Sequence, residues 1–403
     1  MNGIMKNYPR FYTEIIREHL AENRQMAFVS GPRQVGKTTV CRELATTYFN
    51  WDDQDSRALI LKGPAEIAQV AALQKIRTAK PVLAFDELHR YSRWKNFLKG
   101  FFDLYGTQAK IVVTGSSRLD VFKRGGDSLM GRYFCYRMHP FSVAELARPI
   151  LRKEPTASPS ELRENEWTAL WTYGGFPEPF VRRDARFSRR WHSLRETQLL
   201  REDVREMTRI QEIDQLIALA TVLAERSSDQ VVYASLAKQV RVSENTVRAW
   251  VGALAALHLG FLVRPWHRNV SRAIRKEPKW FCRDWSMIGD VGKRAETFVA
   301  CHLLKAVEGW TDLGLGKFDL HYIRDKQKRE VDFLVTKNHQ PWFLVEVKNA
   351  ESRLSPTLAL MQSQTGAQHA FQVVIEEPYV AADCFQQKMP VVVPARTFLS
   401  QLL

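Results

Sequence analysis

The chain has 403 residues, 45% of them hydrophobic and 26% charged, which is typical of globular proteins and unlike disordered or fibrous ones. Its length predicts roughly two to four domains. Lysine and arginine outnumber aspartate and glutamate by 59 to 44, a formal net charge of +15. Such an excess of base favours a polyanionic partner.

Membrane-spanning and disulfide-rich classes are excluded by the pattern of apolar residues and cysteines. The longest largely apolar run, residues 249–263, includes His258 and is shorter than the roughly 18 residues that span a bilayer. No N-terminal pattern indicates a signal peptide. The cysteines lie far apart without a C-x-x-C pair, which argues against a zinc site or a disulfide framework. We therefore expect a cytoplasmic protein outside the membrane.

The first 145 residues or so alternate short apolar runs with helical stretches. Strands are predicted at residues 26–30, 48–52, 82–86, 111–114 and 134–138. Strands that alternate with helices predict a parallel sheet with helices on both faces.

A glycine-marked turn, GPRQVGKT, follows the first of these strands and matches G-x-x-x-x-G-K-[ST]. Glycines let the backbone amides turn inward, and the N-terminus of the following helix (predicted at 39–47) adds partial positive charge. Lys37 is expected to neutralise the β- and γ-phosphates of ATP, and the Thr38 hydroxyl to bind Mg²⁺. The predicted nucleotide-binding residues here are Gly31, Pro32, Arg33, Gln34, Val35, Gly36, Lys37, Thr38 and Thr39.

The strand at 82–86 ends in two adjacent carboxylates. Asp86 is expected to hold the Mg²⁺ shell and Glu87 to polarise the attacking water. The plainer alternative is an acidic helix cap, which needs only one carboxylate. Thr114 or Ser116, at the end of the next strand, is a candidate sensor of the γ-phosphate, although small polar residues also form turns there.

The ordered segments GPRQVGKT, FDELHR, VTGSSRLDVF, SLMGRYFCYRMHPFSVAEL and YGGFPEPF together resemble bacterial and archaeal AAA-type ATPases with a conserved C-terminal domain of unknown function. This resemblance covers about residues 10–350. It implies that Arg132 is an arginine finger for a neighbouring subunit and that Pro177 belongs to a turn placing a helical lid against adenine. A surface arginine that caps a turn, and a simple helix–helix corner, are the alternatives.

Residues 231–263 predict a helix-turn-helix, with Ser243 as the N-cap of a second helix that begins at Glu244. The family resemblance agrees with a winged helix. Asn245, Thr246 and Arg248 are expected to face outward, where they suit a DNA groove. Winged helices that only pair proteins are the alternative.

The following stretch, residues 264–283, carries seven basic residues against one acid, with aromatic residues interleaved. Base alternating with stacking groups favours contact with a nucleic-acid backbone; a solvated basic loop is the alternative. The basic residues are Arg264, Arg268, Arg272, Arg275, Lys276, Lys279 and Arg283.

Near the C-terminus Asp332 precedes E-x-K, Glu346 and Lys348, on the next apolar strand. Alternation places Glu346 and Lys348 on one face, with Asp332 converging from an antiparallel neighbour. The pattern resembles the D…E-x-K core of restriction-endonuclease-like nucleases, and Glu296 on a preceding amphipathic helix resembles that of archaeal Holliday junction resolvases. Metal ligands are then expected at Glu296, Asp332 and Glu346, with Mg²⁺ or Mn²⁺ bound and Lys348 positioning the nucleophile. A strand pair with a structural salt bridge would look similar.

The fold class expected is α/β, in four parts: a P-loop AAA-type ATPase core (1–148), a helical lid (149–212), a winged helix with the basic loop (213–285) and a restriction-endonuclease-like α/β domain (286–403). The function expected is an oligomeric, Mg²⁺-dependent ATPase that acts on DNA, with branched or duplex DNA as candidate substrates, and carries a metal-dependent nuclease-like module. The alternative is a nucleotide-controlled switch or scaffold for DNA or protein whose nuclease-like domain does not cut; protein remodelling is a third option.

Overall fold

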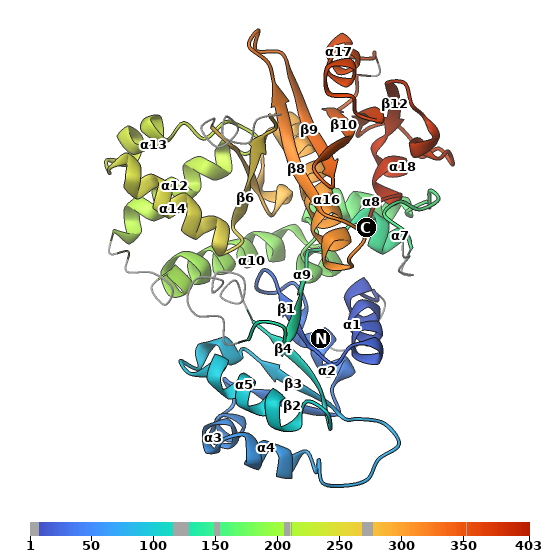
Figure 1. The fold of residues 1–403 in the computed structure, drawn as a ribbon. Coiled ribbons are helices and arrows are strands. Elements are labelled where there is room, and N and C mark those ends of the chain that lie inside the picture. The colour runs from blue at the N-terminus through green and yellow to red at the C-terminus, as the bar shows by residue number, and fades with distance from the viewer. Residues whose placement is uncertain are drawn as a thin grey trace. The chain divides into compact units, whose positions relative to one another are not determined.

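The computed structural model describes residues 8–115, 129–148, 154–204, 210, 212–267, 277–351 and 353–403. It divides into two compact units, Met1–His139 and Pro140–Leu403, which Figure 1 shows in blue to cyan and in green to red. Among the helices described, none has both the length and the apolar character needed to cross a bilayer.

The first unit contains a five-stranded sheet in the order β2-β3-β4-β1-β5, and every neighbouring pair is parallel. The predicted α/β class is confirmed, with strand ends shifted by one or two residues. The elements of this unit are α1 (Phe11–Glu22), β1 (Met26–Ser30), α2 (Lys37–Leu44), β2 (Thr47–Asn50), α3 (Gln54–Lys62), α4 (Pro64–Val70), β3 (Val82–Asp86), α5 (Trp94–Tyr105), β4 (Lys110–Thr114) and β5 (Tyr133–Arg137).

Helices cover both faces of this sheet. Alternate residues of a strand point to opposite faces, so both faces present apolar side chains against which helices pack. On one side Phe28 and Phe85 join a core with Phe97 and Phe101 of α5. On the other side α1 and α2 pack against the strands. The interior strand β1, between β4 and β5, is buried at every residue, as expected for a parallel sheet covered on both faces.

The second unit holds a seven-stranded mixed sheet in the order β12-β11-β10-β9-β8-β6-β7. Its helices are α7 (Val143–Ala147), α8 (Glu164–Tyr173), α9 (Pro177–Arg182), α10 (Ala185–Thr197), α12 (Ile213–Glu225), α13 (Tyr233–Val240), α14 (Glu244–Ala256), α16 (Val291–Asp312), α17 (Pro356–Thr365) and α18 (Ala395–Ser400). Its strands are β6 (Gly260–Pro265), β7 (Lys279–Cys282), β8 (Phe318–Arg324), β9 (Glu330–Lys337), β10 (Gln340–Lys348), β11 (His369–Val374) and β12 (Val391–Pro394).

The predicted helix-turn-helix is formed by α13 and α14. The Ser243 side chain accepts from the Thr246 backbone N–H at 3.1 Å, which confirms it as the N-cap. Asn245 and Arg248 are exposed as predicted, although Arg248 also pairs with Glu244 at 2.6 Å.

The antiparallel pair β6–β7 that follows α14 is not a free-standing wing. Arg264 and Pro265 of β6 pair in parallel with His321 and Tyr322 of β8. The sheet is therefore continuous across the boundary predicted at residues 285/286. The division of the chain into four parts stays a prediction.

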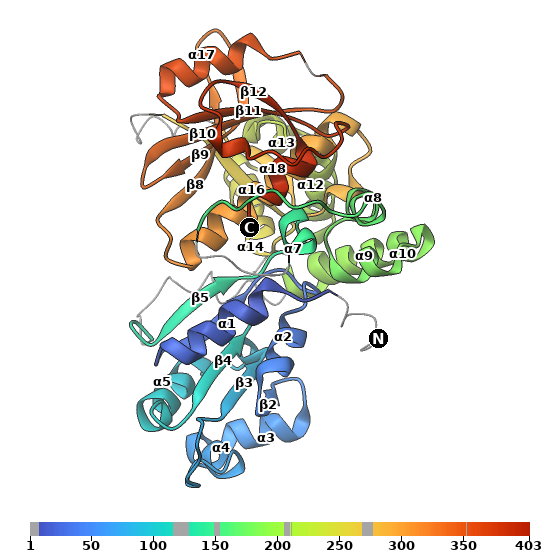
Figure 2. The ribbon, with the colours of Figure 1, turned by 90° about the vertical axis from the view of Figure 1, so that its right-hand side faces the viewer.

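Two helical layers enclose the C-terminal strands (Figure 2). On one face Leu334 and Leu344 form a core with Leu358 and Met361 of α17. The alternate residues point the other way, where Phe343 contacts Phe398 of α18 and α16 packs against β8, β9 and β10.

A buried histidine, His302, joins α16 to the start of α7. Its Nε2 accepts from the Val143 backbone N–H at 3.1 Å, and its Nδ1 lies 2.7 Å from the Phe298 carbonyl. These partners require the neutral ring with its proton on Nδ1, since a second proton on Nε2 would face the Val143 N–H. Burial lowers the pKa of His302 to about 3.

We expect His302 to make the second unit sensitive to acid. A histidine whose pKa is depressed in the folded state contributes stability above about pH 6.5, and this is lost as the pH falls toward 3. At pH 4.5 the loss relative to pH 7 is about 2 kcal/mol. Urea unfolding of wild type and His302→Gln, which keeps an acceptor without titrating, measures it. The stability advantage of wild type should shrink on acidification; a constant difference would contradict the assignment.

Candidate functional site

The turn between β1 and α2 requires glycine at two positions. Gly31 has φ +143°, and a Cβ there would lie 2.2 Å from the Met138 carbonyl oxygen. Gly36, with φ +102°, is the N-cap of α2, which begins at Lys37, two residues earlier than predicted. Gln34 also has a positive φ, of 63°. The backbone thus curls at the helix N-terminus, the geometry that presents amides to an anion.

Lys37 lies inside this turn and is 6% exposed. Its Nζ donates to the carbonyls of Gly31 at 2.9 Å and Pro32 at 2.7 Å. Burial lowers its pKa, and the nearby carboxylates of Glu87 and Asp86 oppose that change. The lysine is therefore held at the loop by backbone hydrogen bonds that a phosphate oxygen could replace.

Asp86, at the end of β3, is the centre of a hydroxyl cluster. Its Oδ2 accepts from the Thr38 hydroxyl at 2.8 Å, and its carboxylate also accepts from the hydroxyls of Tyr48 and Thr114. Thr38 and Asp86 offer the hard oxygen ligands that Mg²⁺ prefers, next to a buried lysine. The residues present fit a Mg²⁺–nucleotide. Tyr48 was not predicted, because the sequence does not reveal that β2 lies beside β3.

Glu87 follows Asp86 in a left-handed conformation, with φ 52°. Its backbone N–H donates to the Thr114 hydroxyl at 3.4 Å, and its carboxylate lies 3.6 Å from Nε2 of His89. Burial raises the pKa of Glu87, while Lys37 opposes the rise. A carboxylate with a raised pKa at this position is suited to accept a proton.

Arg10 supports the loop from outside any predicted motif. It is buried, and its two terminal nitrogens donate to the carbonyls of Val35 at 2.6 Å and His139 at 2.5 Å. Two such bonds from one guanidinium fix the loop relative to the segment after β5. The sequence contains no signal for it, since Arg10 lies more than twenty residues from the loop it holds.

Three other residues predicted for the nucleotide site stand outside the loop in the sequence. Arg132 forms a two-bond ion pair with Asp103 of the same chain, at 2.8 and 3.1 Å, and its role as an arginine finger stays a prediction. Pro177 is buried at the first position of α9, in the second unit, and its adenine contact also stays a prediction. Ser116 lies outside the described residues.

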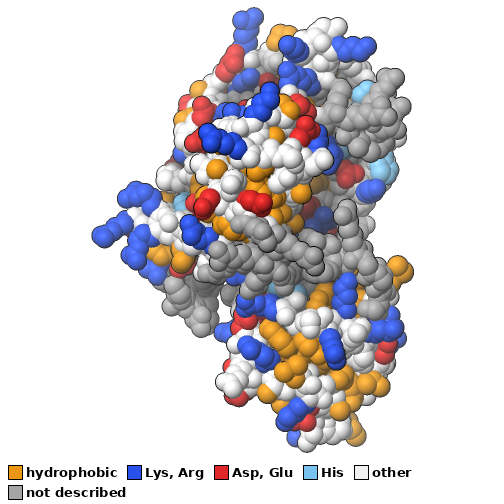
Figure 3. Space-filling view, turned by 90° about the vertical axis from the view of Figure 1, so that its left-hand side faces the viewer, with side chains coloured by type: hydrophobic (Ala, Val, Ile, Leu, Met, Phe, Trp, Pro, Cys, Tyr) orange, Lys and Arg blue, Asp and Glu red, His pale blue; other side chains and the backbone are white. Residues whose placement is uncertain are grey.

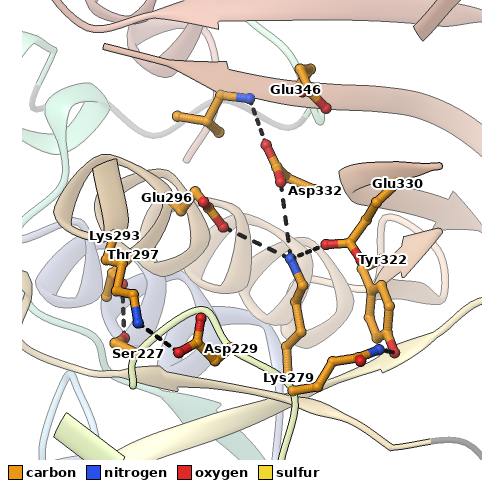
Figure 4. A network of polar contacts seen from close by, with 12 residues as sticks. Ser227, Asp229, Lys279, Lys293, Glu296, Thr297, Tyr322, Glu330, Asp332 and Glu346 are labelled. Carbon is orange, nitrogen blue, oxygen red and sulfur yellow. Dashed lines mark hydrogen bonds and ion pairs between the residues drawn. The ribbon is translucent and has the colours of Figure 1, made fainter. Parts of the chain in front are cut away.

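The C-terminal carboxylates converge on one face of the sheet (Figure 4). Asp332 of β9 accepts from the Val347 backbone N–H of the antiparallel strand β10 at 2.8 Å. Glu346 and Lys348 pair at 3.0 Å, so they share a face as predicted. Glu296 lies on α16.

Lys279 of β7 occupies the middle of this cluster. Its Nζ lies 2.5 Å from Glu330, 3.8 Å from Glu296 and 4.0 Å from Asp332. Burial and then Asp332 raise the pKa of Glu296 to about 8, with Lys279 acting in the opposite direction. Burial and Asp332 likewise raise the pKa of Glu346 to about 7. Within the part of the chain that the structure describes, no three histidine, cysteine, aspartate or glutamate side chains form a metal-binding group.

The prediction of a nucleic-acid contact over residues 264–283 is wrong at the C-terminal end of this stretch. Lys279, Trp280 and Arg283 are 5%, 1% and 7% exposed, so they are not a solvated nucleic-acid contact. The alternation of base and aromatic residues here reflects a strand, β7, whose four residues are all buried. Residues 268–276, with Arg268, Arg272, Arg275 and Lys276, lie outside the described residues.

Three family models match consecutive parts of the chain. Residues 23–147 match an AAA domain, residues 164–296 match a domain of unknown function, DUF8612, and residues 291–393 match another, DUF4143. Together with the sheet order and the loop geometry, the first match makes the N-terminal unit a P-loop domain of the AAA type. The predicted likeness of the last part to nucleases is not among these matches.

The curated relatives are distant. Two uncharacterized proteins, from Mycobacterium tuberculosis and Mycobacterium bovis, are each 22% identical over 326 residues, which cover 79% of this chain and 69% of theirs.

Similar solved structures include the Aeropyrum pernix Orc1 protein in complex with DNA, at 13% identity and TM-score 0.29, covering 72% of this chain and 90% of that one. AMPPCP-bound DnaA from Aquifex aeolicus matches at 13% identity and TM-score 0.30, covering 60% of this chain and 86% of that one. TM-scores this low do not establish a shared arrangement over the whole chain.

Proposed function

We propose that this chain is a Mg²⁺-dependent ATPase whose nucleotide cycle controls its contact with DNA. The observation that carries the proposal is the hydrogen bond between the Thr38 hydroxyl and Asp86, at 2.8 Å, beside the buried Lys37. It joins two hard oxygen ligands and one cation at the N-terminus of α2, the set needed to hold a metal-bound triphosphate.

The roles of the residues follow from their chemistry. Lys37 would exchange its loop carbonyls for β- and γ-phosphate oxygens, and Thr38 and Asp86 would hold Mg²⁺, which neutralises charge that develops on the phosphates. Glu87 would orient a water and take its proton, helped by its raised pKa. Arg10 keeps the loop in position through Val35. The test is release of phosphate from ATP by the full chain in Mg²⁺; no release, or equal release in EDTA, would refute the proposal.

Self-association is part of the proposal, because arginine fingers act across an interface between subunits. The candidate finger, Arg132, pairs with the exposed Asp103 on the surface of the first unit, and a phosphate of a neighbouring subunit's nucleotide could replace that carboxylate. Light scattering should therefore give a mass above one chain in ATP. A chain that stays monomeric at all concentrations while it hydrolyses ATP would contradict a finger in trans.

A face of α9 and α10 supports the DNA contact. Residues 182–190 hold five arginines against one acid, Asp184. Arg186, Arg189 and Arg190 have the spacing that groups side chains on one helix face, and all three are exposed, as is Arg182. In Figure 3 basic side chains gather at the left edge of the molecule, at the level of α10. Clustered arginines of this kind suit the phosphate backbone of DNA.

Replacing Arg182, Arg186, Arg189 and Arg190 together with alanine should weaken binding to duplex DNA of any sequence. The dependence of log K on log salt should flatten by about 0.9 for each phosphate that the variant no longer neutralises, because fewer counterions are released. Fluorescence anisotropy at several salt concentrations measures both. The matched control removes four exposed lysines of the first unit: Lys62, Lys75, Lys80 and Lys99. If the control variant loses DNA affinity to the same extent, the effect is due to net charge and not to this cluster of arginines.

For the C-terminal part, the geometry favours the alternative in which the nuclease-like domain does not cut DNA. The specific observation is Lys279, whose ammonium lies between Glu330, Glu296 and Asp332. Metal-dependent hydrolysis needs two or three carboxylates free to hold a cation. Incubation of the chain with linear, forked and four-way DNA in Mg²⁺ or Mn²⁺ tests this. Cleavage that Asp332→Ala abolishes would restore the nuclease.

A further inference from the structure

Lys279 is a charged side chain with almost no access to water. It is 5% exposed, and its Nζ lies within 4.0 Å of carboxylate oxygens of Glu330, Glu296 and Asp332. Its Nζ also lies 5.5 Å from the centre of the Tyr322 ring. The ammonium group is thus surrounded by groups that favour a cation.

The three carboxylates come from two different elements, α16 and β9, and meet only around this lysine (Figure 4). Three acids brought this close repel one another unless a cation lies between them. Their half-buried position makes the repulsion stronger than in water. A cation at this point is therefore required by the packing of the second unit, and Lys279 supplies it.

The backbone around Lys279 fixes it in that position. Lys279 pairs with Val263 of β6 and bridges to Gln230. On either side of it the Pro278 carbonyl accepts from Val231 N–H at 2.7 Å, and Trp280 N–H donates to the Asp229 carbonyl at 3.1 Å. A long side chain held from both neighbouring peptide units loses little further freedom when its end is captured.

Residues 227–231, the segment that pairs with the backbone around Lys279, are also bound to α16, the helix that carries Glu296. Lys293 Nζ of α16 donates to the Asp229 side chain at 2.6 Å, and the hydroxyls of Ser227 and Thr297 lie 2.8 Å apart. The lysine and one of its acids are therefore positioned by a single connected structure. That structure joins the strand pair after the helix-turn-helix to the C-terminal domain.

We propose that Lys279 takes the place of a divalent metal ion in the carboxylate centre of Glu296, Glu330 and Asp332. This inference rests on one part of the proposed function, that this centre does not cut DNA. It adds the reason, which is that Lys279 occupies the position of the metal ion. With Lys279 present, its ammonium occupies the point between the carboxylates and repels a divalent ion. Without it, the same carboxylates are free to turn toward one Mn²⁺ or Mg²⁺ and to bind it as hard oxygen ligands.

The experiment measures binding of Mn²⁺ without nucleotide, by electron paramagnetic resonance of the free ion, in the full-length chain. Wild type should show no Mn²⁺ binding that depends on Asp332. Lys279→Gln, which is neutral but still polar, should gain one Mn²⁺ per chain, bound at least about tenfold more tightly than by wild type. Asp332→Asn in the same variant should remove the gain. Lys279→Arg, which keeps the charge, is the matched control and should not gain it.

Thermal unfolding provides a second measurement if the neutral variant is poorly folded. Mn²⁺ should raise the melting temperature of Lys279→Gln and leave that of wild type and of Lys279→Arg unchanged, because only the neutral variant has lost the positive charge at position 279. Wild type that binds Mn²⁺ through Asp332 as tightly as Lys279→Gln would overturn the proposal. So would a folded Lys279→Gln chain that gains neither binding nor stability. DNA cleavage is scored separately, so a failure of the non-cutting proposal is distinguishable.

Discussion

Replacing Lys37 with alanine is expected to abolish ATP binding, with a rise in Kd of at least about 100-fold. The Nζ of Lys37 is the buried cation inside the loop, and it is held there by the carbonyls of Gly31 and Pro32. Its removal leaves the triphosphate facing loop carbonyls and the carboxylates of Asp86 and Glu87 without a counter-charge. A charge-assisted hydrogen bond to a phosphate in such a site is worth about 3 kcal/mol, which sets the size of the effect.

Isothermal titration with ATP in Mg²⁺ measures the affinity of each chain directly. Lys75→Ala, which removes an exposed lysine from the same unit, is the matched control and should bind as wild type does. Circular dichroism separates lost affinity from lost structure. If a folded Lys37→Ala chain binds ATP as tightly as wild type, the loop is not a phosphate site.

Replacing Glu87 with glutamine should leave ATP binding within a few-fold of wild type and lower the rate of hydrolysis by about 100-fold or more. The amide keeps the shape of the side chain and cannot accept the proton of the attacking water. The hydrogen bond from the Glu87 backbone to Thr114 does not involve the side chain, so the strand end should stay in place. Single-turnover hydrolysis, measured beside binding, separates the two effects.

Asp86→Asn is the informative comparison for Glu87→Gln. Asp86 accepts from Thr38, Tyr48 and Thr114, so its replacement should impair Mg²⁺-dependent binding as well as turnover. If Glu87→Gln and Asp86→Asn change binding and turnover in the same way, Asp86 and Glu87 do not have the separate roles proposed, metal binding and proton acceptance. Normal turnover in Glu87→Gln would remove Glu87 from the chemistry altogether.

Local patterns predicted the first unit well because its chemistry is local. The turn from Gly31 to Thr38 follows its strand directly, and glycine is required there by a backbone constraint, the Met138 carbonyl 2.2 Å from where a Cβ would be. Asp86 and Glu87 lie at a strand end that hydrophobic run length reveals. What the pattern missed, Arg10 and Tyr48, depends on which distant segments become neighbours.

In the C-terminal part, contacts between distant segments decide more of the site than local patterns do. The pairing of Glu346 with Lys348, and the approach of Asp332 from the antiparallel strand, follow from alternation along strands. The environment of these carboxylates does not, because Lys279 reaches them from a strand about fifty residues earlier in the chain. In the sequence, Lys279 lies among arginines and tryptophans and has the pattern of a nucleic-acid contact. Only the sheet order, in which β6 lies between β7 and β8, brings it to the acids.

The continuity of that sheet determines how the chain can be divided for expression. A fragment that began after residue 285 would leave the edge of β8 without its partner strand at His321 and Tyr322. Unpaired strand edges recruit other chains, so such a fragment should aggregate. It would also leave Glu296, Glu330 and Asp332 without Lys279 and mutually repelled. The whole second unit, Pro140–Leu403, should therefore be produced as one piece, because α7 and α8 also contact α16, through His302 and Phe298.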